Sequence, residues 1–469
     1  MRLLPPLVPL AVHWNTRGAM PDRDHTSDAA PELAGFLTRH PDTAWLDALV
    51  VDLAGTLRGK RYPREEMATL FRGGMQFPMS SYYLDATGAC LDPLGRGLSD
   101  GDPDATCRPL PGTLRAVPWG AQPGAQVLMG MCAPDGGPSP LEPRHLADRE
   151  VQRLAQLGYR ACCAFELEFY LLEPGAPGAA PRAAAAARLG QVYRMDEVEE
   201  AEELLDAIQA ACRVQEIAAS VATSEYAAGQ FEINLCHGPQ PMDAADQCVL
   251  FRRLVRAVAR RHGLRASFMA KPFAAQTGSG MHLHLSLLDD TARNCFDDGS
   301  ARGTALLQHA IAGLLHTLPE ALALYAPNVN SFRRFRPATF VPVNASWGYN
   351  NRSVAVRVPA GENAARRIEF RVPGADAHPY LVLAAVLASV RHGLEHRLDP
   401  GPPASANACL RPAADLPLEW LPALSRLEGS SVFAHSLGAD FVALYCEAKR
   451  LEARKFHDYI GAREYEWYL

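Results

Sequence analysis

The sequence predicts an α+β fold, with a small β-rich domain followed by a larger domain of mixed helices and strands. Between about residues 41 and 140, short apolar runs alternate with turns rich in proline and glycine, as in AVPWGAQPGAQVLMGM. From about residue 141 onward, segments with the apolar spacing of helices alternate with segments that have the two-residue period of strands. We therefore expect a disordered extension at residues 1–40, a β-rich domain at 41–140 and a large domain at 141–469.

The predicted elements follow one another clearly at several points of the chain. The run WLDALVVDLAGTLRGKRYP, residues 45–63, predicts a strand, a turn at Gly55 and a second extended segment. A helix is expected after Pro143, and a strand is expected in ACCAFELEFYLLE, residues 161–173. Near the C-terminus, residues 442–460 have the pattern of an amphipathic helix with interleaved acidic and basic side chains.

Composition excludes several classes of protein. A net charge of −6 argues against nucleic-acid binding, and no unbroken apolar run of about 18 residues predicts a membrane span. The eleven cysteines lack paired metal-binding spacing, so reduced thiols and a cytoplasmic location are expected. The opening MRLLPPLVPLAVHW is similar to a secretion signal, but three prolines interrupt it. We interpret it as part of the extension, or as a segment upstream of a translation start at Met20.

Two short motifs place pairs of ligand-type side chains on one face of a strand. In GSGMHLHLSL, His282 and His284 alternate with leucines and therefore point the same way. A buried histidine taken alone is more typical of a packed core than of a ligand site. In FELEFYLL, however, Glu166 and Glu168 also share a face and have apolar neighbours. Two buried carboxylates repel each other unless a cation lies between them, so the pattern favours metal binding.

Three further glutamates extend this set. Glu225 and Glu232 flank a turn at Gly229 in SEYAAGQFEINL, and Glu369 occurs in the strand-like RRIEFRVPG. Five glutamates and one histidine suffice for two sites that prefer Mg²⁺ or Mn²⁺ to Zn²⁺. Two such ions clamp a phosphoryl group during its transfer. Because the carboxylates crowd together, we expect removal of Glu369 to relieve charge repulsion and to leave the fold intact.

Arginine is concentrated in one stretch of the chain. Between residues 333 and 371 there are eight arginines and no lysine. They are Arg333, Arg334, Arg336, Arg352, Arg357, Arg366, Arg367 and Arg371. The planar fork of arginine grips phosphates and carboxylates, so this bias favours anion recognition in a shared cleft over a basic surface patch. The phosphate-binding loop pattern GxxxxGK[ST] is absent, so a phosphoryl-transfer site of another kind is expected.

Five motifs occur in an order that resembles the glutamine synthetase superfamily. They are FELEF, EYAAGQFEINL, KPF followed by GSGMHLHLSL, NNRSVAVRVP, and RRIEFRVPGADAHPYL, and the resemblance extends over residues 40–469. It implies a small β-grasp-like N-terminal domain and a large α/β catalytic domain built on an antiparallel sheet. It also implies that ATP phosphorylates the γ-carboxylate of glutamate and that an amine then displaces phosphate. Family members form stacked rings, commonly dodecamers, with active sites between subunits, so a homo-oligomer is expected.

The resemblance also implies a role for individual residues, with ATP and two or three Mg²⁺ or Mn²⁺ ions as cofactors. One metal site would comprise Glu168, Glu225 and Glu232, and the other Glu166, His282 and Glu369. The residues expected at the ATP phosphates are His284, Ser286, Arg352, Arg357 and Arg367, of which Arg352 and Arg357 are also expected to be catalytic. Those expected to hold glutamate are Gly278, Arg334 and Arg371. Asp85, in YYLDATGA, matches an aspartate that helps to deprotonate the incoming amine across the subunit boundary.

Two departures from the glutamine synthetase pattern concern the amine and the glutamate. Phe340 stands where glutamine synthetases carry a glutamate that binds ammonium, and Thr277 replaces an asparagine that contacts glutamate. An aromatic ring suits an alkylated amine better than ammonium, since it offers contact to methylenes. With LRGKR and LPGTL, the pattern resembles the γ-glutamylpolyamine synthetase branch and makes putrescine the leading substrate. Ammonia, a monoamine or ethanolamine stay open as alternatives, as does a non-catalytic sensor.

Overall fold

The first sheet is formed by residues 45–131. In the computed structural model, which describes residues 29–176, 179–184 and 190–469, its strands run in the order β2–β1–β6–β4–β3, with β5 paired to β6. The strands are β1 (Trp45–Val51), β2 (Leu57–Pro63), β3 (Met75–Pro78), β4 (Asp104–Pro109), β5 (Arg115–Val117) and β6 (Gly124–Met131). The strand, turn and strand expected at residues 45–63 are confirmed. β1 and β2 pair across a turn in which Gly55 has a φ of 72°, a value that glycine adopts without strain.

The second sheet is larger and carries the predicted metal ligands. Its strands run in the order β12–β13–β14–β11–β7–β9–β8, with β10 paired to β7. The strands are β7 (Arg160–Leu172), β8 (Ala219–Ser224), β9 (Gln230–Leu235), β10 (Arg265–Ser267), β11 (Met281–Leu288), β12 (Trp347–Tyr349), β13 (Val356–Val358) and β14 (Ile368–Phe370). Only the β12–β13 pair is parallel among the described strands of this sheet, so the expected antiparallel sheet is confirmed.

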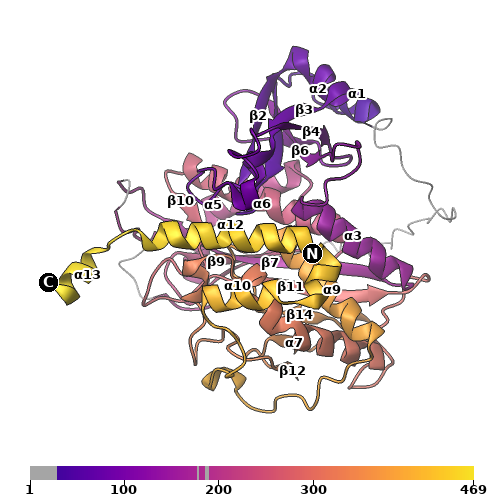
Figure 1. Cartoon of the computed structure of the whole chain (residues 1–469), viewed down its shortest axis with the longest axis vertical. Helices are drawn as coiled ribbons and strands as arrows, with labels where there is room; N and C mark the ends of the chain where they lie inside the picture. Colours follow the sequence, from indigo (N-terminus) through magenta and orange to yellow (C-terminus); the bar gives the residue numbers. More distant parts are fainter. Residues whose placement is uncertain (1–28, 177–178, 185–189) are drawn as a thin grey trace, which may run out of the picture.

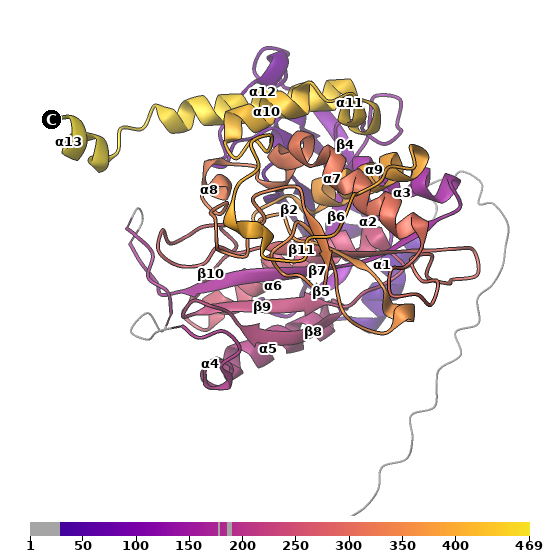
Figure 2. The ribbon, with the colours of Figure 1, turned by 90° about the horizontal axis from the view of Figure 1, so that it is seen from below.

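Helices cover the sheets and complete the α+β architecture. Figure 2 shows α7, α9, α10 and α12 gathered on one side of the second sheet, while α13 projects away from the body. The helices are α1 (Ala29–Arg39), α2 (Met67–Gly73), α3 (Pro143–Gln156), α4 (Met195–Glu200), α5 (Glu202–Val214), α6 (Pro241–Arg261), α7 (Ala305–Tyr325), α8 (Val329–Phe332), α9 (Pro379–Glu395), α10 (Trp420–Glu428), α11 (Ser431–Leu437), α12 (Ala439–His457) and α13 (Ala462–Tyr468). Among the described residues, no helix has both the length and the apolarity that a bilayer crossing requires.

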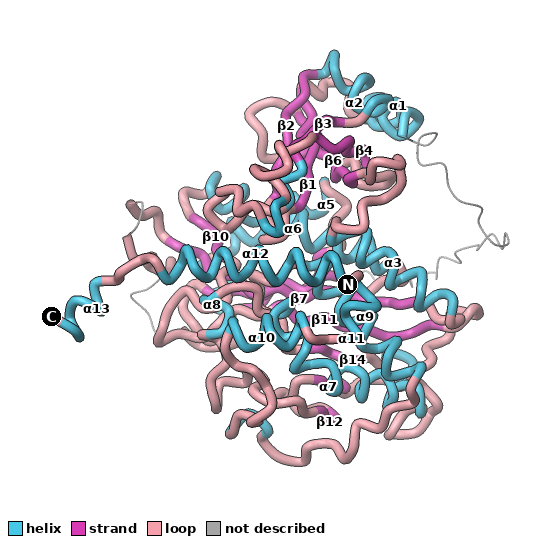
Figure 3. Tube along the Cα trace, viewed as in Figure 1, coloured by secondary structure: helices cyan, strands magenta, loops and turns pink. Residues whose placement is uncertain are grey.

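One continuous apolar core joins the two sheets, which lie in separate parts of the molecule (Figures 1 and 3). It receives alternate side chains of the central strands, including Phe165, Leu167 and Phe169 of β7, all fully buried. The even-numbered residues of the same strand therefore face the other way, as the two-residue period predicts. The boundary expected near residue 140 stays a prediction.

The structure corrects the expected disordered extension, residues 1–40, in its last part. Residues 1–28 lie outside the described part of the chain, but residues 29–39 form α1. Leu33 and Phe36 are buried in the core, with Leu37 packed against it, at the spacing of one helical face. This apolar stripe is only about one turn long, and polar residues on both sides obscured it in the sequence.

Candidate active site

Adjacent strands of the second sheet place five of the six predicted metal ligands together. Glu166 and Glu168 lie on β7, Glu232 on β9, His282 on β11 and Glu369 on β14. The register aligns His282 with Glu166 and Glu168 with Glu232, and it aligns His284 of β11 with Glu369. Directly opposed residues in a ladder share a face. The five side chains therefore emerge from the same surface of the sheet.

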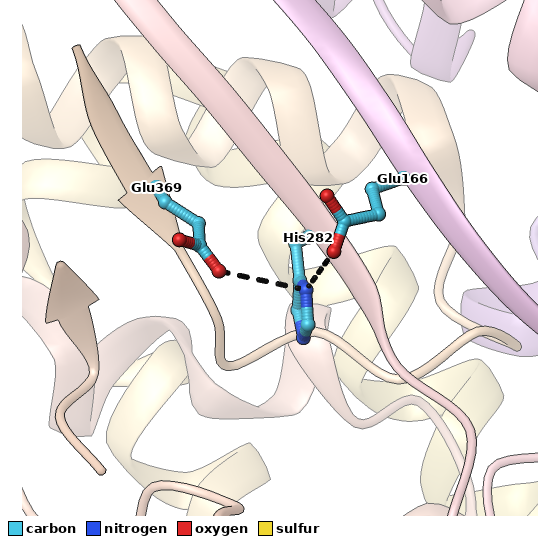
Figure 4. A group of neighbouring side chains, drawn as sticks. All are labelled: Glu166, His282 and Glu369. Atoms are coloured by element: carbon cyan, nitrogen blue, oxygen red, sulfur yellow. Dashed lines mark hydrogen bonds and ion pairs between the residues drawn. The ribbon is translucent and has the colours of Figure 1, made fainter. Parts of the chain in front are cut away.

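The first group of ligand atoms is formed by Glu166, His282 and Glu369 (Figure 4). His282 Nδ1 lies 2.9 Å from Glu166 Oε1 and 3.7 Å from Glu369 Oε1. One ligand atom from each of the three residues lies within 4.8 Å of the others, which is close enough for a shared ion. Two carboxylates and one imidazole fit a hard divalent cation such as Mg²⁺ or Mn²⁺. The structure thus brings together one of the two predicted ligand sets.

The second group differs from the predicted set in one member. It contains Glu168 and Glu232, as expected, but His282 takes the place of Glu225. Glu225 follows β8, and its backbone N–H donates to the Gln230 carbonyl oxygen at 2.9 Å, which closes the turn at Gly229. Burial and the charge of Glu168 raise the pKa of the Glu225 side chain to about 8. Glu225 therefore interacts electrostatically with the second group, although in the described structure its carboxylate oxygens are not among the ligand atoms that lie within 4.8 Å of one another.

The two sides of the cluster have opposite electrostatic character. Burial and the negative charges of Glu166 and Glu168 raise the pKa of Glu232 well above its usual value. Burial also acts to raise the pKa of Glu369, but the cationic groups around it, led by Arg371, outweigh this effect and lower the pKa to about 2. Negative charge is therefore in excess at Glu232 and compensated at Glu369.

The arginine contacts of Glu369 correct one expectation from the sequence. Arg371 Nη1 donates to Glu369 Oε1, and Arg357 Nη1 donates to Oε2 at 2.6 Å. Removing this carboxylate would leave two arginines without their shared counter-charge. The expected relief of repulsion on losing Glu369 is wrong, because the glutamate balances cations as well as adjoining acids.

A cavity of about 1130 Å³ adjoins the first group and contains three of the predicted phosphate-binding residues. His284, Ser286 and Arg367 line it together with Glu166. Arg367 Nε donates to His284 Nδ1 at 3.1 Å, and His284 Nε2 lies 3.0 Å from Glu166 Oε2. Because arginine only donates, Nδ1 is the acceptor and His284 carries its proton on Nε2. The volume of the cavity, together with its His284, Ser286 and Arg367 side chains, is suited to a nucleotide.

His237 also lines this cavity and was missed by the sequence interpretation. Its Nδ1 lies 3.2 Å from Cys162 Sγ, and burial together with His284 and Arg367 lowers its pKa to about 4. The imidazole is therefore neutral at pH 7. Its position just after β9, the strand that bears Glu232, was the available signal.

The remaining arginines do not share one cleft. Arg352 is exposed, and neither Arg352 nor Arg357 lines the large cavity. Arg366 donates to the carbonyl oxygens of Ser300 and Ala301, so it stabilises a loop. The expectation that alternation directs these guanidinium groups into a common cleft therefore fails for Arg366, because its loop turns the side chain toward local carbonyls.

The predicted glutamate-binding residues lie close to the ligand cluster. Arg334 is buried, its Nη1 donates to the Val372 carbonyl oxygen at 2.7 Å, and its Nε has no hydrogen-bond partner among the residues that the structure describes. Gly278 packs against it: a Cβ at this position would lie 2.7 Å from the Ala270 carbonyl oxygen and 2.9 Å from Arg334 Cγ. Glycine is required here by close packing. Together with Arg371, these residues border the cluster where a carboxylate ligand could be held.

Phe340 lies against a second aromatic side chain that the sequence interpretation missed. Its ring is stacked on that of Tyr226, with 6.4 Å between the centroids and 21° between the planes. Phe340 and Tyr226 are 48% and 49% exposed, respectively. Phe340 has a φ of 56°, a left-handed conformation that is strained for a bulky residue. In the chain, Tyr226 directly follows Glu225, the sixth predicted metal ligand.

Asp85 lies in a loop of the N-terminal part of the chain, with its carboxylate fully engaged. Lys455 Nζ of α12 donates to Oδ2 at 2.6 Å, while the backbone N–H groups of Thr87 and Ala89 donate to Oδ1 at 2.8 and 2.9 Å. Burial acts to raise the pKa of Asp85, but the Lys455 and Thr87 hydrogen bonds outweigh it and lower the pKa to about 2. Within the described chain, the side chain thus links its own loop to α12.

We expect Asp85→Asn to destabilise the fold by about 1–3 kcal/mol at pH 7, because it removes the charge of a buried carboxylate that pairs with the half-exposed Lys455. A lowered folded-state pKa stabilises the protein above about pH 4, and this contribution is lost as pH falls toward 2. Thermal unfolding of both proteins across this pH range measures the difference. Equal stability at pH 7, combined with a selective loss of amine-dependent turnover, would contradict the structural role and support the proposed catalytic one.

Comparisons with known proteins agree with this geometry. The family model described as "Glutamine synthetase, catalytic domain" matches residues 140–468. The chain belongs to the glutamine synthetase family. It is 38% identical to the γ-glutamylputrescine synthetase PuuA of Escherichia coli K12, over 93% of this chain and 94% of that protein. It is 32% identical to a glutamate–isopropylamine ligase of a Pseudomonas species, over 92% and 96%.

One solved structure is also similar to this chain. The GmaS/ADP complex superimposes with a TM-score of 0.81 at 28% identity and covers 92% of this chain and 98% of GmaS. The α+β fold expected from the sequence is therefore confirmed. The family assignment made from the five motifs is confirmed as well.

Proposed function

We propose that this protein is an ATP-dependent ligase that joins the γ-carboxylate of glutamate to an organic amine, with putrescine as the leading substrate. The observation that carries the proposal is the stacked pair of Tyr226 and Phe340 beside Glu225. Similarity to a γ-glutamylputrescine synthetase and to a glutamate–isopropylamine ligase supports an organic amine. Glutamine synthesis from ammonia is less well supported, since ammonium would meet aromatic rings instead of an additional carboxylate.

The chain's own residues divide the reaction into two steps. Arg334, Arg371 and the backbone at Gly278 are positioned to hold glutamate, while His284, Ser286 and Arg367 bind the ATP phosphates. A γ-carboxylate oxygen attacks the γ-phosphorus, ADP leaves, and an acyl phosphate forms. The neutral amine then attacks the acyl carbon, the carbon–oxygen bond to phosphate breaks, and the amine gives up one proton. Divalent ions held by Glu166, His282 and Glu369, and by Glu168 and Glu232 with Glu225, would neutralise charge on the phosphates.

The aromatic pair gives the second step its selectivity for an alkylated amine. Methylene groups gain apolar contact with the exposed rings of Tyr226 and Phe340, while a cationic end gains a cation–π contribution of about 0.5–2 kcal/mol. Ammonium has no methylene group and therefore gains only the cation–π contribution.

The proposal is tested by phosphate release from purified protein with ATP, Mg²⁺ and glutamate and with one amine at a time. The panel comprises putrescine, longer polyamines, isopropylamine, ethanolamine and ammonium. We expect the greatest stimulation by an organic amine, with putrescine first. Stimulation by ammonium alone would identify a glutamine synthetase instead, and ATP binding without turnover for any amine would indicate a sensor.

Tyr226→Ala and Phe340→Ala should each raise the KM for the preferred organic amine by about tenfold, since each removes an aromatic ring that would contact the methylene groups of the amine. Tyr226→Phe is the matched control, because it keeps the ring and removes only the hydroxyl group. Steady-state kinetics with the amine and with glutamate varied in turn measure the effect. An increase in the KM of glutamate alone would contradict the assignment.

Phe340→Glu should raise ammonium-dependent turnover.

Several further features belong to the same proposal. We infer ATP and two or three Mg²⁺ or Mn²⁺ ions as cofactors, a cytoplasmic location, and assembly into stacked homo-oligomeric rings such as a dodecamer. The expected role of Arg352 at the ATP phosphates would require a movement toward the cavity, and that of Asp85 would require a site supplied by a neighbouring subunit. Mass photometry of the purified protein tests the assembly.

A further inference from the structure

A second cavity, of about 430 Å³, lies between β2 and α6. It is formed by residues 47–61 of the first sheet and its turn and by residues 249–260 of α6. None of these residues lines the larger cavity next to the metal ligands. A volume of this size accommodates a small molecule. The cavity is therefore separate from the site of the proposed reaction.

The lining of this cavity has a strong excess of positive charge. Helix α6 contributes Arg252, Arg253, Arg256 and Arg260, whose spacing places them along one side of the helix. Strand β2 contributes Arg58, Lys60 and Arg61. The one acidic lining residue is Asp47, so seven cations face a single carboxylate.

Internal ion pairs satisfy only some of these cations. Asp47 accepts hydrogen bonds from Arg61, at 2.7 and 3.0 Å, and from Arg253, at 2.5 Å. Arg58 Nε donates to the buried Asp52 at 2.9 Å. Within the described ranges, no carboxylate forms an ion pair with the other four lining cations, which are Lys60, Arg252, Arg256 and Arg260. A surplus of positive charge therefore faces the cavity.

Arg252 distinguishes this cavity from an ordinary basic surface. Its side chain is buried, with 5% of the residue exposed, and within the described ranges no carboxylate forms an ion pair with it. Its Nη2 donates to the Ala377 carbonyl oxygen at 2.7 Å and its guanidinium carbon lies 5.9 Å from the centre of the Phe268 ring, but among the described residues its buried Nε has no hydrogen-bond partner. Nη1 of Arg253 is likewise buried without a partner in the described part of the chain. Burying a guanidinium group without a counter-charge is unfavourable, and a solvated helix face would not require it.

We propose that this cavity binds a small phosphate-bearing anion, of the size of a diphosphate group. The arginine fork matches phosphate oxygens in two-point contacts, and several forks converge here from one helix and one strand. Binding would supply the counter-charge that Arg252 and its neighbours lack. The site does not depend on the proposed ligase activity, and its lining residues differ from those of the larger cavity, so it is suited to an effector.

Binding of pyrophosphate to the full-length protein, measured by isothermal titration calorimetry with EDTA present, tests the proposal. The decisive variant is Arg256→Gln/Arg260→Gln, because both side chains are exposed and the fold should tolerate the change. We expect a dissociation constant at least about tenfold higher in this variant. Arg397→Gln/Arg426→Gln removes the same charge from exposed positions elsewhere and should change binding by less than about twofold.

Arg367→Gln provides the second control, since it alters the nucleotide cavity and should leave this binding in place. Pyrophosphate binding that is absent in the unaltered protein, or unchanged in the α6 variant, would overturn the proposal. Loss of assembly in the α6 variant without any anion binding would also overturn it. That result would assign the surplus cations to an acidic surface of a second copy of the chain.

Discussion

Glu369→Gln is expected to lower amine-dependent phosphate release by at least about a hundredfold. The substitution keeps the side chain's size but removes the charge that borders His282 and Glu166 in the first ligand group. Removing a residue that only hydrogen-bonds to a metal ligand already lowers metal affinity or activity by about 10–100-fold. Loss of a ligand itself should therefore be at least as severe. The apparent affinity for Mg²⁺ should fall as well, which a titration of Mg²⁺ at saturating ATP and glutamate measures.

The structure determines which substitution tests this residue cleanly. Glu369→Ala would leave Arg357 and Arg371 facing a cavity, whereas glutamine still offers them an acceptor oxygen. Glu362→Gln is the matched control, because it makes the same chemical change at an exposed position of the preceding loop. It should retain activity within about twofold. Unchanged turnover and unchanged Mg²⁺ dependence in Glu369→Gln would contradict the metal assignment.

Arg367→Gln should lower kcat by about 10²–10³-fold, because it removes a cation from the cavity in which negative charge develops during phosphoryl transfer. It also removes the donor that fixes His284 with its proton on Nε2. The KM for ATP should rise, and Arg367→Lys should restore part of the activity by returning the charge without the fork. Initial-rate kinetics with ATP varied at fixed glutamate and amine measure both effects.

Arg293→Gln is the control for this second prediction. Arg293 lines the same cavity, but its side chain is 83% exposed and pairs with Asp289. Exposed pairs contribute little, so activity should stay within about threefold of the unaltered protein. Similar losses in Arg293→Gln and Arg367→Gln would indicate a general electrostatic effect and contradict a specific role for Arg367.

Local patterns predicted the strands and most of the ligand set, because a two-residue period specifies which side chains share a face. Glu166 and Glu168 on β7, and His282 and His284 on β11, follow this rule directly. Pairing between these strands is not local. The contact between His282 and Glu166 joins residues 116 positions apart, and only the family resemblance placed them in one site.

Features that depend on distant contacts were missed or misjudged. Lys455 engages Asp85 from 370 positions away, and no local signal reveals that partner. No feature of the sequence around Tyr226 indicated that its ring stacks on that of Phe340. Arg366 and Arg367 are neighbours with similar sequence surroundings, yet Arg366 donates to the carbonyl oxygens of Ser300 and Ala301, while Arg367 lines the larger cavity and donates to His284. The geometry of the loop decides which way each of these side chains points, and the sequence pattern does not reveal that geometry.

The identity of the amine that the protein joins to glutamate distinguishes the proposed ligase from a glutamine synthetase. A competition reaction tests it, with equimolar ammonium and putrescine, limiting ATP, and quantification of both products by mass spectrometry. We predict that γ-glutamylputrescine exceeds glutamine by at least about tenfold, and that Tyr226→Ala reduces this ratio. A reaction that yields glutamine as the main product would contradict the proposed role of the Tyr226–Phe340 pair and identify ammonia as the substrate.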